Sequence, residues 1–265
     1  MPVYLFALSQ QNPVNWFNAA VVFVVLHLLV YPASNGYNSY MDRDTSPIGG
    51  LSHPLQPTKQ LYYFTIAMDA MAVAASLLVS WVFALGILLY ITASRAYSYR
   101  GIRLKQYPLA GFLTVFICQG ALIFFLTYHA TDPQLRLGVP LLPCITASLL
   151  IGALYPLTQV YQHKADEQDG VTTISMLLGK RGSFVFSMLL FLLATMLFYI
   201  MFQEQPNFFY LYLLILLPVV LFFLYWMKKV WVNGDAADFR HSLLMNILCT
   251  LCTTAFFITL IVLNH

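Results

Sequence analysis

Two short polar patches hold half of the acidic residues of a chain that is otherwise apolar. The first runs from Asn38 to Asp44 and includes Asp42, and the second runs from Asp166 to Asp169. Together they contain five of the ten Asp and Glu residues. Oxygen-rich clusters of this kind suit Mg²⁺, which proteins usually bind through a few carboxylates together with substrate phosphates. The patches therefore predict a magnesium site for an anionic, phosphate-bearing substrate.

The rest of the chain has the composition of a membrane protein. Of its 265 residues, 60% are hydrophobic and 9% are charged, and the mean hydropathy is +0.74. A soluble domain carries about 25% charged residues, and a soluble fold could not hide this much apolar surface. The net charge of +3 is modest and there is no basic tail, which argues against a nucleic-acid partner. We therefore predict an integral membrane protein in contact with the lipid bilayer.

Eight apolar stretches are close to the roughly 20 residues that a spanning helix needs. They lack the period-two alternation of strands that span membranes, which excludes a barrel. The stretches are residues 14–34, 62–80, 81–100, 109–130, 138–160, 182–203, 207–228 and 240–263. The sequence thus predicts an all-α polytopic membrane protein, with one domain over residues 1–265 built as a helical bundle of eight spans.

The basic residues predict how this bundle lies in the membrane. If eight spans alternate, twelve of the thirteen Lys and Arg residues fall on one side and only Arg136 on the other. The positive-inside rule assigns the side with twelve to the cytoplasm, and we expect a bacterial inner (plasma) membrane. Both acidic patches lie on that face, as does a third polar stretch from Tyr97 to Lys105. Three separate loops would then form one site, facing the cytoplasm at the mouth of the bundle.

The spacing within the two patches resembles a known family. The pattern N-x-x-x-D at residues 38–42, and D-x-x-x-G-x-x-T at residues 166–173 followed by L-G at residues 178–179, resemble the two signatures of the UbiA superfamily of intramembrane prenyltransferases. The resemblance spans nearly the whole chain, and the stretch from Tyr155 to Gly179 is its more specific part.

This resemblance implies a fold of nine helices around a central cavity, with Mg²⁺ held between the two motifs and an allylic prenyl diphosphate bound to it. The implied catalytic residues are Asn38, Asp42, Lys105 and Asp166. The implied metal ligands are Asp42, Asp44, Asp166 and Asp169. The residues implied to bind the substrate are Tyr99, Arg103, Tyr161 and Gln162. The implied reaction transfers the prenyl group to a hydrophobic acceptor, which is a lipid or an aromatic molecule.

That chemistry makes two demands on the side chains around the site. The diphosphate leaves as an anion, so Mg²⁺, Lys and Arg stabilise the transition state, most strongly where water is excluded. The carbocation left behind is stabilised by aromatic faces, each contributing about 0.5–2 kcal/mol through cation–π attraction. Several tyrosines lie beside the polar patches, namely Tyr37, Tyr40, Tyr97, Tyr99, Tyr155 and Tyr161.

The chain also departs from the family pattern. Acids are usual at three positions that hold Ser39, Ser46 and Gln162 here, and nearby acids are possible substitutes. Those substitutes are Asp44, Glu167 and Asp169. The expected ninth helix would precede residue 14, and Met1–Leu8 resembles its last third. We therefore expect an altered set of metal ligands and a truncated N-terminal helix.

Other interpretations stay open. Eight or nine spans with Asp69 inside the second one would also suit a secondary transporter, although no internal repeat is visible. The missing carboxylates would suit a family member that binds an isoprenoid without turnover. The acidic patches could be solvated loops with local ion pairs, and the basic residues and tyrosines could be interfacial anchors. The sequence specifies neither the acceptor nor the length of the prenyl chain.

Overall fold

The computed structural model describes residues 1–43, 47 and 51–264, and these residues fold into helices without any β-strand. The α-helices are α1 Pro2–Ser9, α2 Trp16–Phe23, α3 Tyr31–Asp42, α4 Lys59–Ser76, α5 Trp81–Ser98, α6 Pro108–Val115, α7 Ile123–Thr131, α8 Leu141–Leu154, α9 His163–Gln168, α10 Ile174–Met201, α11 Pro206–Val232 and α12 Phe239–Asn264. Short π-helical turns join α2 to α3 and α6 to α7 into longer continuous helices. The predicted all-helical class is confirmed.

Seven helices in the described part of the chain have the length and apolarity of membrane spans. They are Trp16–Asp42, Trp81–Ser98, Pro108–Thr131, Leu141–Thr158, Ile174–Met201, Pro206–Val232 and Phe239–Asn264. The one predicted stretch outside this set is the second, residues 62–80, which forms most of α4. That helix has the length of a span, but it includes Lys59 and Asp69 and is less apolar than the other seven. The protein is thus a polytopic membrane protein.

The first span differs from its predicted bounds of residues 14–34. Its helix continues to Asp42, so the first motif lies in the last turns of the helix and does not follow it. The extra turns are polar because one side of them faces a cavity within the bundle, where Ser34, Asn35 and Asn38 contribute to the lining. A prediction that follows apolar residues alone therefore places the end of this helix too early.

Local signals explain where other helices start and break. The Thr173 side chain caps α10 by accepting a hydrogen bond from the backbone N–H of Met176 at 3.3 Å, and Ser80 caps α5 in the same way. Such N-caps contribute about 1 kcal/mol each. Gly179 interrupts α10 with φ 68° and ψ 169°, a conformation that glycine adopts far more readily than other residues. The long apolar part of α10 follows this break, close to the predicted start at residue 182.

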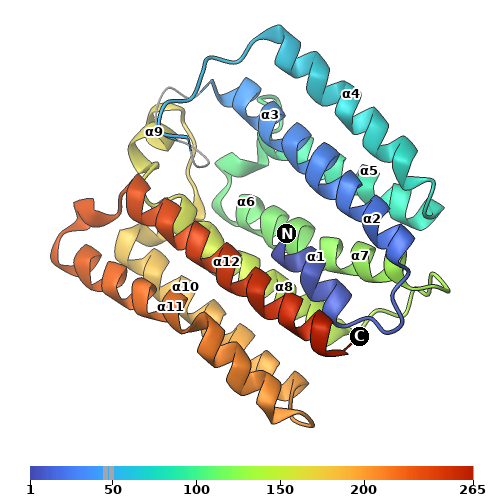
Figure 1. Cartoon of the computed structure of the whole chain (residues 1–265). Helices are drawn as coiled ribbons and strands as arrows, with labels where there is room; N and C mark the ends of the chain where they lie inside the picture. The colour runs from blue at the N-terminus through green and yellow to red at the C-terminus, as the bar shows by residue number, and fades with distance from the viewer. Residues whose placement is uncertain (44–46, 48–50, 265) are drawn as a thin grey trace.

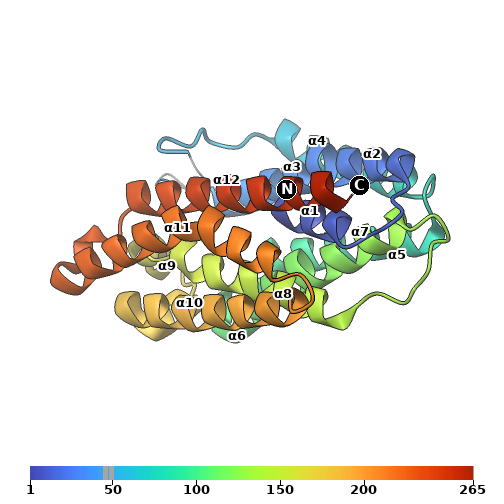
Figure 2. The same ribbon diagram turned by 60° about the horizontal axis from the view of Figure 1, so that its bottom comes forward.

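The helices surround a short central one. Figure 1 shows α1 inside the bundle, with α2 to α5 on one side of it and α10 to α12 on the other. Helix α1 packs against α12 and α7. Seen from the second direction, the molecule is flatter, with α12 and α3 above α6 and α10 (Figure 2).

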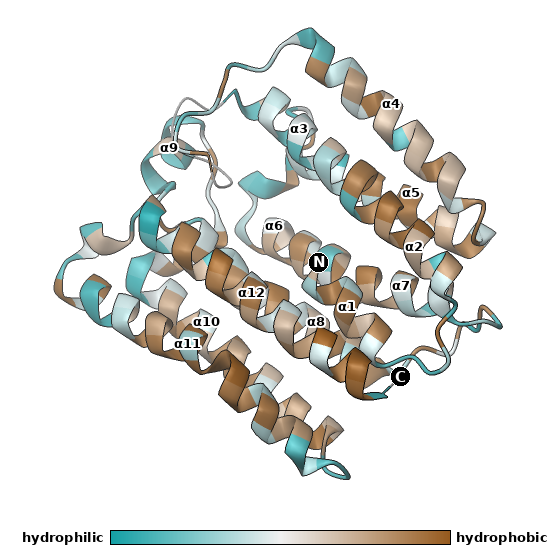
Figure 3. Cartoon of the chain, in the orientation of Figure 1, coloured by the Kyte–Doolittle hydropathy of each residue, from teal (hydrophilic) through white to brown (hydrophobic). Residues whose placement is uncertain are grey.

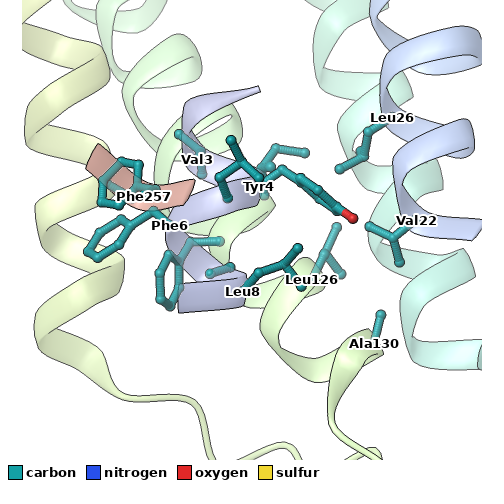
Figure 4. Packing of buried hydrophobic residues seen from close by; sticks show 14 of the residues in the cluster. Val3, Tyr4, Phe6, Leu8, Val22, Leu26, Leu126, Ala130 and Phe257 are labelled. Carbon is teal, nitrogen blue, oxygen red and sulfur yellow. The ribbon is translucent and has the colours of Figure 1, made fainter. Parts of the chain in front are cut away.

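Aromatic packing anchors α1 in the core. The Phe6 side chain is fully buried, and its ring stacks on Phe257 of α12 with 4.8 Å between centroids and meets Phe124 of α7 edge-on at 5.0 Å. The Tyr4 hydroxyl donates to the Ala19 carbonyl at 2.9 Å, and its ring points toward the helix that carries Val22 (Figure 4). Aromatic pairs of this kind contribute about 0.5–1.5 kcal/mol beyond the area they bury.

Polar residues gather at one end of the bundle. Figure 3 shows hydrophobic colouring along the middle of most helices and hydrophilic colouring around α9 and the adjoining ends of α3 and α12. Both acidic patches lie at this end, because α3 ends there and α9 lies there. The fold therefore positions the predicted site residues at the polar end of a lipid-exposed bundle.

Candidate functional site

The two acidic patches meet at one cavity, which we call the charged pocket. It has a volume of about 280 Å³, and three carboxylates contribute to its lining: Asp42 from α3, Asp166 from α9, and Asp169 just after α9. Lys105 enters from the loop between α5 and α6. The predicted convergence of three polar segments is therefore present in the structure.

Helix α3 presents its motif residues on one face. Asn38 and Asp42 are four residues apart, so their side chains lie one turn above each other. The Asn38 amide oxygen accepts a hydrogen bond from the Ser98 hydroxyl at 2.7 Å. The Asp42 side chain is only 5% exposed and forms an ion pair with the Lys105 ammonium group. A carboxylate at a helix C-terminus is unfavourable in the helix dipole, and this cation offsets that cost.

The second motif forms a short helix and a tight turn. Helix α9 ends at a turn in which the N–H of Val171 donates to the carbonyl of Asp166 at 2.8 Å. Gly170 lies in this turn with φ 68°, a left-handed conformation that costs a residue with a Cβ atom about 1–2 kcal/mol. The glycine of the motif thus lets the chain reverse and keeps Asp166 and Asp169 on the pocket side. Glu167, one of the predicted substitute acids, is exposed instead.

Arg103 connects the two patches. Its guanidinium forms an ion pair with the Asp169 carboxylate and donates to the Asp169 carbonyl at 3.0 Å. One of its nitrogens also lies 3.9 Å from Asp42 Oδ1. Arg100 reinforces the link, because it lies 3.5 Å from Asp169 Oδ1 and donates to the Met41 carbonyl at 2.8 Å. Partly buried charges are tolerated when they are paired in this way.

A second and larger cavity adjoins the charged pocket. We call it the polar cavity. Its volume is about 490 Å³, and Asn35, Asn38, Tyr97 and Gln162 line both spaces. It extends between α3, α5, α8 and α12 toward the middle of the bundle. The hydroxyls of Tyr97 and Tyr155 lie 2.5 Å apart in its wall. A molecule with an anionic head and an apolar tail could occupy the two spaces at once.

Most of the residues predicted for the site lie at these two spaces. Those lining the charged pocket are Asn38, Asp42, Lys105, Gln162, Asp166 and Asp169. Tyr161 lines the polar cavity, and Arg103 reaches Asp42 and Asp169 from beside the charged pocket. Tyr99 lies apart: it is 49% exposed, its ring packs beside Gly101, and it is not among the described residues that line either space. Asp44 and Ser46 lie outside the described residues.

Gln159 is a site residue that sequence reasoning missed. It is buried, lines the charged pocket, and its amide oxygen has no hydrogen-bond partner among the described residues. The missed signal was its spacing three residues before Gln162, which places both on one side of a helical turn. A buried carbonyl oxygen without a partner is available to a ligand.

The oxygen atoms of the charged pocket fit a Mg²⁺ ion that has some of its ligands supplied by a substrate. No three His, Cys, Asp or Glu side chains in the described part of the chain lie close enough together to hold a metal ion. The pocket nevertheless offers carboxylate and amide oxygens, including the unpartnered oxygen of Gln159. Mg²⁺ is usually bound by one or two carboxylates together with substrate phosphates. The residues therefore fit an ion that a diphosphate helps to bind.

Two further contacts hold the elements of the site in place. In α4, Asp69 accepts a hydrogen bond from Arg95 of α5 at 2.9 Å, and the Arg95 guanidinium lies 3.9 Å above the ring of Tyr37 on α3. At the start of α9, the His163 imidazole is hydrogen-bonded to the Ser175 hydroxyl at 2.6 Å. Burial of the His163 ring, reinforced by the positive charge of Lys180, lowers the pKa of His163.

Comparison with solved structures places this fold among known ones. A UbiA homolog from Aeropyrum pernix K1 superposes with a TM-score of 0.72 at 18% identity, over 97% of this chain and 94% of that chain. A UbiA homolog from Archaeoglobus fulgidus bound to DMAPP and Mg²⁺ gives 0.65 at 18% identity, over 98% and 93%. A digeranylgeranylglyceryl phosphate synthase gives 0.62 at 17% identity, over 98% and 91%. These similarities show a shared fold.

Sequence comparison identifies the family. No curated protein matches the chain, but a model of the UbiA prenyltransferase family matches residues 1–261. The match includes both acidic motifs and all seven spans except the last three residues of α12. The chain therefore belongs to the UbiA prenyltransferase family.

Proposed function

We propose that this protein is an intramembrane prenyltransferase that moves an isoprenyl group from an allylic diphosphate to a hydrophobic acceptor with the help of Mg²⁺. One observation carries the proposal: both acidic motifs and Lys105 line one pocket that adjoins a larger cavity inside the bundle. The Archaeoglobus fulgidus homolog bound to DMAPP and Mg²⁺ supports the same assignment of substrate and ion.

The charged pocket would take the diphosphate. Lys105 and Arg103 supply positive charge there, and each is paired with a carboxylate. When phosphate oxygens bind to these cations, the released carboxylates could rotate to bind a metal ion. Asp42, Asp166 and the Gln159 amide oxygen are the groups that would hold Mg²⁺. When bound, the ion would stabilise the negative charge that develops on the departing diphosphate. Tyr99 is half exposed, lines neither space, and has no part in this arrangement.

The polar cavity would take the prenyl chain and the acceptor. In the reaction, the allylic C–O bond breaks and its electron pair leaves with the diphosphate. The acceptor donates an electron pair to the allylic carbon and loses one proton to the departing diphosphate. The rings of Tyr97 and Tyr155, held together by their hydroxyls, lie where they can stabilise the positive charge of the allylic group by cation–π attraction.

We also propose that the charged pocket opens toward the cytoplasm of a bacterial inner membrane. The support is the bias of basic residues: if α4 crosses the membrane together with the seven other spans, twelve of the thirteen fall on the side that carries both acidic motifs. The transporter alternative loses its main motivation, because Asp69 is paired with Arg95 and is not among the described residues lining either space.

The test measures consumption of labelled geranyl diphosphate by the protein in lipid nanodiscs, with bacterial lipid extract as the acceptor source and with or without Mg²⁺. Asp42→Asn and Asp166→Asn should lower the Mg²⁺-dependent rate by about 10²–10³-fold, the loss typical of removing one group that stabilises transition-state charge. Glu167→Gln is the matched control, because that acid is adjacent in sequence but exposed, and it should keep full activity. Full activity in both asparagine variants would refute the proposal.

A further inference from the structure

We propose that the acceptor is an uncharged molecule whose head carries hydroxyl groups, and that the protein rejects acceptors with a carboxylate or phosphate head. This inference rests on the proposed prenyltransferase function and specifies its second substrate. It comes from the way charge is divided between the two adjoining spaces.

The polar cavity is lined by many polar side chains but by no formally charged one among the described residues. Most of its lining residues bear a hydroxyl or a side-chain amide, and none of the described ones is Asp, Glu, Lys, Arg or His. These groups come from several helices, with Asn35 on α3, Tyr90 on α5, Gln119 between α6 and α7, and Asn246 on α12. If the acceptor were purely hydrocarbon, like the prenyl chain beside it, no occupant would pair with these polar side chains, which is unfavourable away from water.

The nearest cations are already engaged. Arg100, Arg103 and Lys105 pair with Asp42 and Asp169 around the charged pocket. A diphosphate in that pocket would claim whatever positive charge these pairs release. No described cation of the pocket therefore remains for a second anion.

Arg95, which follows the lining residue Ser94, is engaged as well. It pairs with Asp69 and lies over the ring of Tyr37, between α4, α5 and α3. It is not among the described residues that line the polar cavity. An acceptor carboxylate or phosphate would thus enter a sheltered space without a counter-ion, and burying an unpaired anion is strongly unfavourable.

The amides of the cavity fit hydroxyl groups instead. The side-chain amides of Asn35 and Asn246 line the cavity and form no hydrogen bond with other described residues, so each can donate and accept. A hydroxyl also donates and accepts, which allows reciprocal pairing with such amides. The cavity volume of about 490 Å³ lies within the usual range for small-molecule pockets.

Matched pairs of probes test this inference with the full chain in nanodiscs. One pair is 4-hydroxybenzyl alcohol against 4-hydroxybenzoate, and the other is 1-O-octadecylglycerol against its 3-phosphate. Binding is measured by native mass spectrometry, and transfer from labelled geranyl diphosphate is measured by product analysis. In at least one pair the neutral member should bind at least tenfold more tightly than the anionic member. Equal or tighter binding of both anionic members, or failure of both neutral members to bind, would overturn the inference.

A charge placed in the wall sharpens the test. Asn246→Arg should reverse the preference by at least tenfold toward the anionic probe, because it supplies the missing counter-ion. Asn246→Gln retains the amide and should retain the preference for the neutral probe. Circular dichroism and thermal unfolding establish that both variants fold, and an unchanged preference in a folded Asn246→Arg protein would contradict the inference.

The two proposals fail in different ways. If labelled prenyl groups are transferred equally well to anionic probes, the acceptor inference is wrong and the prenyltransferase function stands. If geranyl diphosphate is neither bound nor consumed while the cavity still selects neutral probes, the prenyltransferase function is wrong and the selectivity of the cavity stands.

Discussion

Two ion pairs of this protein, Asp42 with Lys105 and Asp69 with Arg95, lie in different surroundings. Asp42 and Lys105 line a pocket that adjoins the polar cavity. Asp69 and Arg95 lie between packed helices, only 14% and 17% exposed, with the Tyr37 ring against the guanidinium. Both pairs join an aspartate to a basic side chain, but of the two only Asp42 and Lys105 face a space that a ligand could fill. An acid within a membrane helix is therefore informative about function only together with what it faces.

Breaking the packed pair should have the largest effect on stability. Asp69→Asn leaves the Arg95 guanidinium partly buried without its counter-ion, and losing one partner of a buried pair costs about 3–5 kcal/mol. Thermal unfolding of the detergent-solubilised protein, followed by circular dichroism, would show a much lower midpoint. The double variant Asp69→Leu with Arg95→Leu is the control and should recover most of the loss. A normal midpoint for Asp69→Asn would mean that the packed pair contributes little.

Breaking the pair at the pocket should act on turnover instead. Lys105→Met keeps the length of the side chain but removes its charge, and we expect about a 10²–10³-fold loss in the rate of geranyl diphosphate consumption. The unfolding midpoint should change much less than for Asp69→Asn, because Asp42 still lies 3.9 Å from Arg103. The comparison fails if Lys105→Met unfolds as easily as Asp69→Asn while retaining activity.

A smaller effect should follow from the turn that presents the second motif. No atom lies within 4 Å of a Cβ added at Gly170, but φ is 68° there, so Gly170→Ala introduces backbone strain without a clash. We expect a loss of about 1–2 kcal/mol in stability, together with weaker binding of geranyl diphosphate as Asp166 and Asp169 shift. Isothermal titration alongside denaturation would separate these effects. Gly138→Ala is a suitable control, because its φ is not positive and nothing crowds it.

The smallest effect concerns pH. The folded protein lowers the pKa of His163 below its ordinary value of 6.5, mainly by burying the ring, so the unfolded chain binds a proton more readily than the folded one. Stability from the neutral ring is then complete above about pH 6.5 and falls as the pH drops toward the lowered pKa. Unfolding midpoints between pH 5 and 8 should show this slope for the native protein and a weaker slope for His163→Gln. Identical slopes would remove His163 from the explanation.

The sequence predicted the membrane class and the meeting of the two motifs, because apolar runs and charge bias are strong signals. It misplaced the end of the first span, since Asn38 and Asp42 are polar yet helical. Whether a polar residue at the edge of an apolar run ends a helix depends on what its side chain faces. That information lies in other segments of the chain.

Other features were missed because they depend on tertiary contacts. The partner of Asp69 is Arg95 on the next helix, and no local spacing links the two. The wall of the polar cavity is formed by single polar residues from several helices, such as Gln119 and Asn246. Each of them stands alone among apolar residues in the sequence, so no local pattern marks it as part of a site. Pairing and cavities arise when helices pack, so sequence patterns within one helix do not reveal them.

The position of α1 has a consequence for biosynthesis. Phe6 stacks on Phe257, so the centre of the bundle is closed by residues from the first and the last helix. Helix α1 leaves the ribosome long before its partner α12, which lies about 230 residues later in the sequence, and such long-range closure is intrinsically slow. Until α12 is inserted, the aromatic face of α1 must be accommodated by lipid or by insertion factors. The aromatic core around Phe6 is therefore completed only after α12 is inserted.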